Sequence, residues 1–111
     1  MEDRNVQQIM AFSPEKMKKI GLFDTRHLFC DVYCFEPGQI QKPHTHQESD
    51  KVYYVLEGKG IFKIGGEEKE LGEQQITLAP AGIEHGVTNL GNQRLVLLVF
   101  MAPNPNTPHP H

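Results

Sequence analysis

The chain has 111 residues, a formal net charge of −3 and no basic run longer than Lys18-Lys19. This length suits one domain with a small core, and the charge excludes a basic nucleic-acid-binding protein. No apolar stretch reaches the roughly 18 residues that cross a bilayer, and the N-terminus lacks the basic start and apolar core of a signal peptide. We therefore expect a cytoplasmic protein that binds neither nucleic acid nor membrane.

Composition divides the chain into three parts. Residues 1–15 are polar with scattered apolar positions, and we expect them to form an N-terminal arm. Residues 16–102 are short apolar or alternating segments separated by Gly and Pro, which is typical of an all-β barrel or sandwich. Residues 103–111 alternate proline with polar residues, and we expect them to form an extended, disordered tail.

The expected strands follow one another at short intervals, with turns of Gly, Pro or Asn between them. In chain order they are 16–23, 27–35, 40–46, 51–57, 61–64, 67–71, 75–79, 84–88 and 94–101. The first segment also fits a helix, but its apolar end suits a strand better. No long helical period interrupts the series, so the fold predicted is a small antiparallel β-barrel.

The last expected strand contains the most apolar run of the chain, residues 95–100. Such a run buries both faces of the strand, whereas the interior of a barrel covers only one of them. A second subunit is the natural cover for the other face, so we expect a homodimer.

Three histidines have the spacing of a metal site. His44 and His46 are two residues apart, which on a strand points both imidazoles to one face about 7 Å apart. His85 follows a Pro-x-Gly turn at 80–82, at the start of a later strand. Three imidazoles inside a closed sheet can hold one divalent transition metal, and imidazole does not discriminate among Fe, Mn, Co, Ni, Cu and Zn.

These segments resemble the two sequence motifs of the cupin family. Residues 38–58 are similar to G-x5-H-x-H-x3,4-E-x6-G, and residues 74–89 to G-x5-P-x-G-x2-H-x3-N. The resemblance implies a double-stranded β-helix, or jelly-roll, with an internal metal site at His44, His46 and His85. Cupins include dioxygenases, isomerases, decarboxylases, storage proteins and sugar sensors, so the resemblance implies no single reaction.

The sequence departs from each motif at one position. At the glutamate of the first motif the spacing falls on Lys51, or on Asp50 if the shorter spacing applies. With Lys51 inside, the site has three histidines and is completed by water or substrate; with a bulge, Asp50 becomes a fourth metal ligand. We favour three histidines, because the register to Gly58 is then undisturbed. In the second motif Gln74 stands where the family has glycine.

Lys51 and Tyr53 share one strand face and are the candidate catalytic residues. A lysine desolvated beside a metal has a lowered pKa and can act as a base, or it can anchor a substrate anion. The Tyr53 hydroxyl can orient a substrate or donate a proton, and it can equally serve only to fill the barrel.

The sequence therefore predicts a small metal-dependent enzyme that acts on a small molecule. Oxidation by dioxygen is the first reaction class expected, and isomerisation or decarboxylation come next. The alternative is a non-catalytic module that binds a small anion or a sugar, with Lys51 as counter-ion and the histidines as hydrogen-bonding groups.

Overall fold

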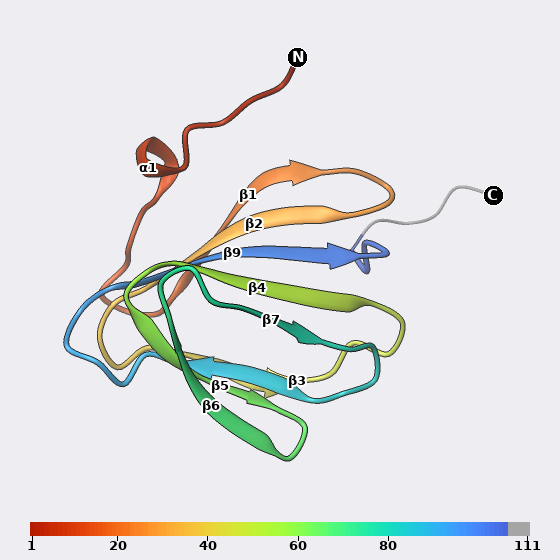
Figure 1. Cartoon of the computed structure of the whole chain (residues 1–111). Coiled ribbons are helices and arrows are strands. Elements are labelled where there is room, and N and C mark those ends of the chain that lie inside the picture. The colour runs from red at the N-terminus through yellow and green to blue at the C-terminus, as the bar shows by residue number, and fades with distance from the viewer. Residues whose placement is uncertain (107–111) are drawn as a thin grey trace.

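A computed structural model describes residues 1–106 of the chain (Figure 1). Within this range one short helix precedes nine strands, which form two antiparallel sheets. The elements are α1 (Val6–Ile9), β1 (Lys18–Asp24), β2 (Phe29–Phe35), β3 (Ile40–His44), β4 (Asp50–Glu57), β5 (Lys59–Ile64), β6 (Glu67–Gly72), β7 (Ile76–Ala79), β8 (His85–Thr88) and β9 (Leu95–Ala102). The predicted all-β jelly-roll is confirmed. Among these residues no helix has the length and apolar character needed to cross a membrane.

The two sheets enclose the interior between them. The larger sheet has the strand order β1-β2-β9-β4-β7 and the smaller one the order β3-β8-β5-β6 (Figure 1). Strand alternation decides which side chains face inward, because successive residues point to opposite faces. On β4 the predicted alternation is observed, since Lys51, Tyr53 and Val55 are buried and the residues between them are partly exposed.

The apolar part of the interior comes from both sheets. Its members are buried and in mutual contact, and they are Phe29, Tyr33, Phe35, Tyr53, Val55, Phe62, Leu71, Ala79, Val87, Leu95, Leu97, Val99 and Met101. Gln41, Lys51 and His85 are buried too, although they are polar. Burying polar groups is unfavourable unless they find partners, so these three residues mark the part of the interior built for something other than packing.

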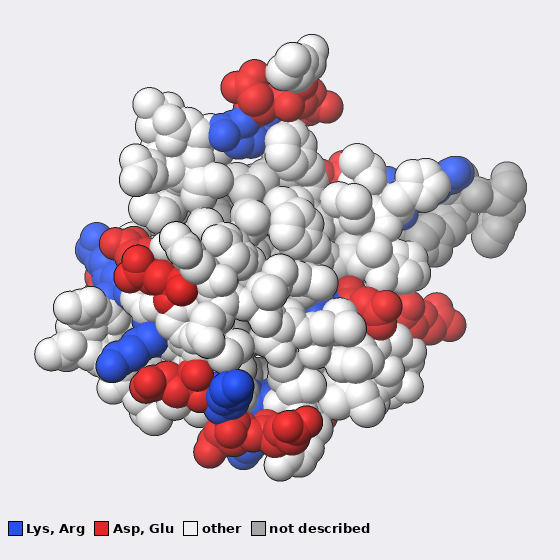
Figure 2. Space-filling view, in the orientation of Figure 1, with Lys and Arg blue, Asp and Glu red and all other residues white. Residues whose placement is uncertain are grey.

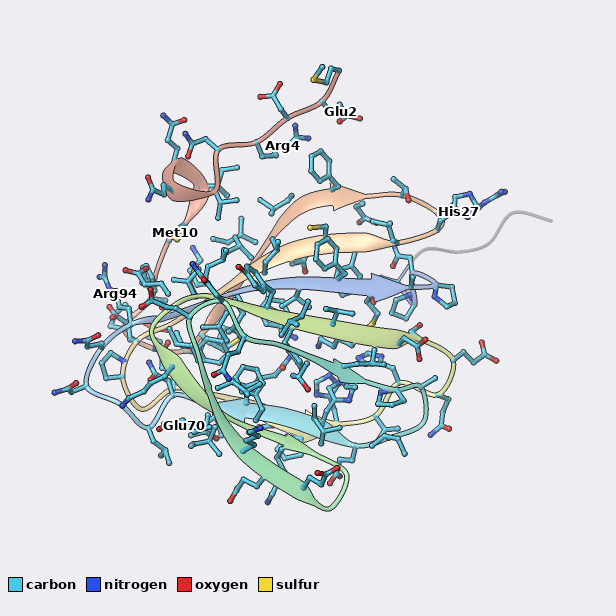
Figure 3. All side chains as sticks on the ribbon, viewed as in Figure 1. Glu2, Arg4, Met10, His27, Glu70 and Arg94 are labelled. Carbon is cyan, nitrogen blue, oxygen red and sulfur yellow. The ribbon has the colours of Figure 1, made fainter. Side chains whose placement is uncertain are left out.

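The N-terminal arm packs on the outer face of the larger sheet. Val6, Ile9 and Met10 pack against a buried cluster on that face, which includes Val32 and Val96. Figure 3 labels Met10, where the arm leaves α1. The arm therefore provides part of the cover that we expected from a second subunit.

The rest of this outer face remains apolar and open. Ile76 is 62% exposed, Leu78 50% and Phe100 38%. Figure 2 shows few charged side chains over β9, β4 and β7, which lie side by side in this sheet. The homodimer remains a prediction, and these strands are the surface where we expect it.

Residues 103–106 differ from the expected disordered tail. Asn104 is fully buried, and its Nδ2 donates to Asp24 Oδ1 at 2.6 Å and to the Thr25 carbonyl at 2.8 Å. The Ser49 hydroxyl donates to the Pro103 carbonyl at 2.6 Å. Composition could not predict these contacts, because most of the hydrogen bonds come from the side-chain amide of one residue, Asn104. The remainder of the predicted tail, 107–111, lies outside the described residues.

The departure from the second motif leaves the backbone of the turn intact. Gln74 has φ of +70°, the left-handed conformation that glycine adopts most easily, and its N–H donates to the Val55 carbonyl at 3.0 Å. Such a conformation costs a non-glycine residue roughly 1 kcal/mol. The turn that leads into β7 therefore has the backbone conformation that glycine would give it, with slight strain at Gln74.

Candidate metal centre

The three predicted histidines meet inside the barrel. His44, at the end of β3, lies opposite His85, at the start of β8, and their ring centroids are 4.4 Å apart. His46 lies beyond the end of β3 rather than on the strand, yet its ring centroid is only 4.8 Å from that of His44. One ring nitrogen from each of the three lies within 4.8 Å of the others, so they are close enough to hold one ion.

A glycine beside His85 lets the two strands approach closely. A Cβ added at Gly86 would lie 2.9 Å from the Gln41 carbonyl oxygen and 3.0 Å from Pro43 Cα. Backbone atoms of β3 cannot yield as a flexible side chain does, so any larger residue forces β3 away from β8. The contact between His44 and His85 depends on this close approach.

Gly86→Ala is therefore expected to reduce both stability and metal binding. Overpacking of this kind lowers the free energy of unfolding by about 1–3 kcal/mol, and the separated strands hold His44 and His85 too far apart. Gly66→Ala, in the β5–β6 hairpin where an added Cβ meets nothing within 4 Å, is the matched control. Urea unfolding and zinc titration measure the two effects, and identical behaviour of both variants would contradict this explanation.

The loop that leads to His85 is held by residues of the first motif. The Gly82 N–H donates to the His46 carbonyl at 2.8 Å, and the Ala81 N–H donates to Asp50 Oδ1 at 2.9 Å. Asp50 is exposed, and the structure does not bring it together with the three histidines. Its carboxylate instead braces the loop that positions His85.

Backbone carbonyls set the tautomers of two of the histidines. His44 Nδ1 lies 2.9 Å from the Lys42 carbonyl oxygen, and His85 Nδ1 lies 2.9 Å from the Ile83 carbonyl oxygen. Because a carbonyl oxygen only accepts, each Nδ1 carries the hydrogen and each neutral ring has its lone pair on Nε2. Hydrogen bonds of this type orient histidine ligands in metal sites.

Burial keeps the histidines neutral. It lowers the pKa of His44 and His46, and it lowers the pKa of His85 to about 4, although the Ile83 carbonyl acts in the opposite direction. Neutral imidazole is the form that binds a metal, so no proton has to leave these rings at neutral pH.

The donor set fits a divalent transition metal. His85 is 1% exposed and its Nε2 is buried without a hydrogen-bond partner among the described residues. An unpartnered buried acceptor is unfavourable, and a metal ion at that nitrogen would satisfy it. Nitrogens that share one ion at about 2.1 Å each lie roughly 3–3.5 Å apart, so the rings need only a small further approach.

Lys51 faces inward, as the three-histidine alternative requires. It is 1% exposed, and its Nζ lies 5.1 Å from the Tyr33 ring centroid and 5.2 Å from that of Tyr53. Burial, assisted by the charge of Lys19, lowers the pKa of Lys51 to about 7, while Asp31 acts in the opposite direction. A lysine therefore occupies the interior where the family motif has an acid.

Tyr53 donates its hydroxyl hydrogen to Gln41 Oε1 at 2.8 Å. Burial, with a smaller effect of Tyr33, raises the pKa of Tyr53, so the phenol keeps its proton. Gln41 was not among the predicted site residues, yet it is 5% exposed and its Nε2 has no hydrogen-bond partner among residues 1–106. The one feature of the sequence that could have indicated Gln41 is its position, as a polar residue, within the first motif.

An opening of about 800 Å³ lies between the edge strands β1 and β3 and reaches His44 and His46. Its lining includes Gln41, His44 and His46. The charged residues around it are Lys16, Lys18, Lys19 and Lys42, and no acidic residue lines it. The approach to the site is therefore cationic.

Several known proteins are similar to this chain. The crystal structure of TT1209 from Thermus thermophilus matches with a TM-score of 0.92 and 43% identity, over 95% of this chain and 100% of that one. The uncharacterized protein SCO3923 of Streptomyces coelicolor is 29% identical over 70% of this chain and 73% of its own length. The tetracenomycin polyketide synthase protein TcmJ of Streptomyces glaucescens is 33% identical over 66% of this chain, which spans about half (51%) of TcmJ.

The family model of the cupin domain matches residues 31–101, which is more than half of the chain and includes all three histidines. The two-sheet fold and the two motifs agree with this match. The chain belongs to the cupin family.

Proposed function

We propose that this protein is a metal-dependent enzyme that acts on a small molecule, with one divalent transition metal held by His44, His46 and His85. The buried His85 Nε2, unpartnered among the described residues and close to two other imidazoles, is the observation that carries the proposal. Three protein ligands leave positions for a substrate, as in catalytic rather than structural metal sites. The metal would supply Lewis-acid activation or dioxygen chemistry at those positions.

The chain's own residues would bind, orient and exchange protons. The Lys42 and Ile83 carbonyls fix the rings of His44 and His85. Lys51 has a pKa of about 7 and can therefore hold or release a proton at Nζ near neutral pH. Tyr53 keeps its proton and holds Gln41 in place, so we assign it a positioning role rather than proton transfer.

The reaction class proposed first is oxidation by dioxygen, and isomerisation or decarboxylation come next. An all-histidine ligand set with open positions supports each of them. The name of TcmJ refers to polyketide synthesis, which is consistent with a small organic substrate. The alternative is a non-catalytic binding module, which the buried Lys51 in place of an acidic ligand favours.

Turnover by the metal-loaded protein tests this proposal. Protein loaded separately with Fe(II), Mn(II), Ni(II) or Zn(II) is expected to consume oxygen, to release carbon dioxide or to form an isomer detected by NMR, with members of a panel of small thiols, diketones, phenols and carboxylates. His46→Ala should retain less than about 1% of that rate, because the metal is lost with its ligand. Stoichiometric metal without turnover on the whole panel would favour the binding module.

A further inference from the structure

We infer that the small molecule bound here carries an oxyanion, either a carboxylate or a phosphate, and that Lys51 and Gln41 form the subsite that holds it. The inference rests on the proposed function, since it concerns the substrate of the same metal centre. Three features carry it: a buried amine without an ion-pair partner, a buried amide nitrogen without a hydrogen-bond acceptor, and an opening lined by charges of one sign only.

Lys51 is a buried amine that has no ion-pair partner within 4 Å among the described residues. Both ion pairs found among residues 1–106 involve arginine, so no carboxylate of that range lies within 4 Å of the Lys51 nitrogen. Its nitrogen lies about 5 Å from the centroids of the Tyr33 and Tyr53 rings, and the Asp31 carboxylate acts on it from beyond 4 Å. An unpaired charge in an interior is strongly unfavourable, and an anion that enters the site would remove that penalty.

Gln41 presents a hydrogen-bond donor to the same interior. Its Oε1 is occupied by the Tyr53 hydroxyl, which fixes the orientation of the amide. Its Nε2 is buried and has no acceptor at hydrogen-bond geometry among the described residues. Burial, with a smaller effect of Asp31, raises the pKa of Tyr33, and Gln41 acts in the opposite direction, so the Tyr33 hydroxyl lies near the amide. An amide nitrogen has two hydrogens, and at least one stays free.

The mouth of the site selects for negative charge. Four lysines line it, no acidic residue does, and Gln41, His44 and His46 line the same opening. A cleft with charges of one sign concentrates the opposite ion and speeds its entry. A ligand that follows this field meets Gln41 and two of the three histidines, His44 and His46, in the wall of the opening. A neutral sugar would gain no charge attraction from the four lysines of the opening or from the buried Lys51.

Anion titration of matched lysine variants tests the subsite. Malonate and inorganic phosphate are titrated by calorimetry into the full-length wild type, Lys51→Met and Lys63→Met, each metal-free and zinc-loaded. Lys63 is an exposed lysine of β5, so its substitution removes the same charge away from the interior. We expect Lys51→Met to weaken binding by about 10- to 100-fold and Lys63→Met to leave it unchanged. The anion that binds more tightly identifies the oxyanion.

Gln41→Glu provides a second test that keeps the Tyr53 hydrogen bond. The new carboxylate can pair with Lys51 and repel an anion, so binding of both probes should be lost. Equal affinities of the wild type and Lys51→Met, or no binding of either probe by the wild type, would overturn the subsite.

Zinc content, measured on every sample, separates this inference from the proposed function. Anion binding that depends on Lys51 in protein that takes up no metal would support the subsite and contradict the metalloenzyme. Stoichiometric zinc without anion binding by the wild type would support the metal centre and overturn the subsite.

Discussion

Replacing His85 with alanine is expected to lower the affinity for zinc by at least about 100-fold. Loss of a group that only orients a ligand already costs roughly 10- to 100-fold, and here a ligand itself is removed. The ring of His85 is also fixed in orientation, because its Nδ1 is 2.9 Å from the Ile83 carbonyl oxygen and the residue is buried. Competition with a chromophoric chelator measures the affinities of the two proteins.

His27→Ala is the control for this experiment. His27 is exposed in the loop between β1 and β2, and Figure 3 places it at the end of that hairpin, away from β3 and β8. Its removal should leave zinc affinity unchanged. If His85→Ala is folded by circular dichroism and binds zinc as tightly as His27→Ala, the ligand assignment is wrong.

Lys51→Met is expected to stabilise the metal-free protein at pH 7. Methionine has a similar length and no charge to desolvate, so the free energy of unfolding should rise by about 1–3 kcal/mol. A lysine kept at this position despite such a cost is consistent with a role in binding rather than in packing. Chemical denaturation of both proteins, with a chelator present, measures the difference.

The same substitution should change how stability depends on pH. The folded pKa of Lys51, about 7, is below the unfolded value of 10.5, so the unfolded chain binds more protons between these two values. Stability of the wild type therefore rises as pH increases above 7, by about 1.5 kcal/mol up to about pH 8.5 from this residue. The difference between the two proteins should shrink by that amount over this window, and a constant difference would show that Lys51 keeps its ordinary pKa.

Much of the fold could be predicted from sequence because its signals are local. Each expected strand between 16 and 101 overlaps an observed one, since alternation and Gly or Pro turns depend on near neighbours. The pairing of His44 and His46 with His85 followed from motif spacing, although His46 lies past the end of its strand. The inward position of Lys51 followed from undisturbed alternation with Tyr53 on β4.

The parts that sequence missed depend on contacts between distant segments. The ladder between β3 and β8 is irregular from Gln41 to His44, so counting by twos back from His44 selects the exposed Ile40 instead of Gln41. The burial of Asn104 requires the β1–β2 hairpin to meet the end of β9, which composition cannot show. The bracing role of Asp50 needs a backbone N–H from Ala81, in a loop far along the chain.

The proposed metal centre requires three imidazoles to hold one metal ion. X-ray absorption at the zinc edge, on protein loaded with one equivalent of zinc, tests it most directly because multiple scattering counts imidazole ligands. We expect three imidazoles in the wild type, with the remaining positions filled by oxygen, and two in His85→Ala when excess zinc forces occupancy. One imidazole or none in the wild type, or the same number in both proteins, would show that these histidines do not form the site.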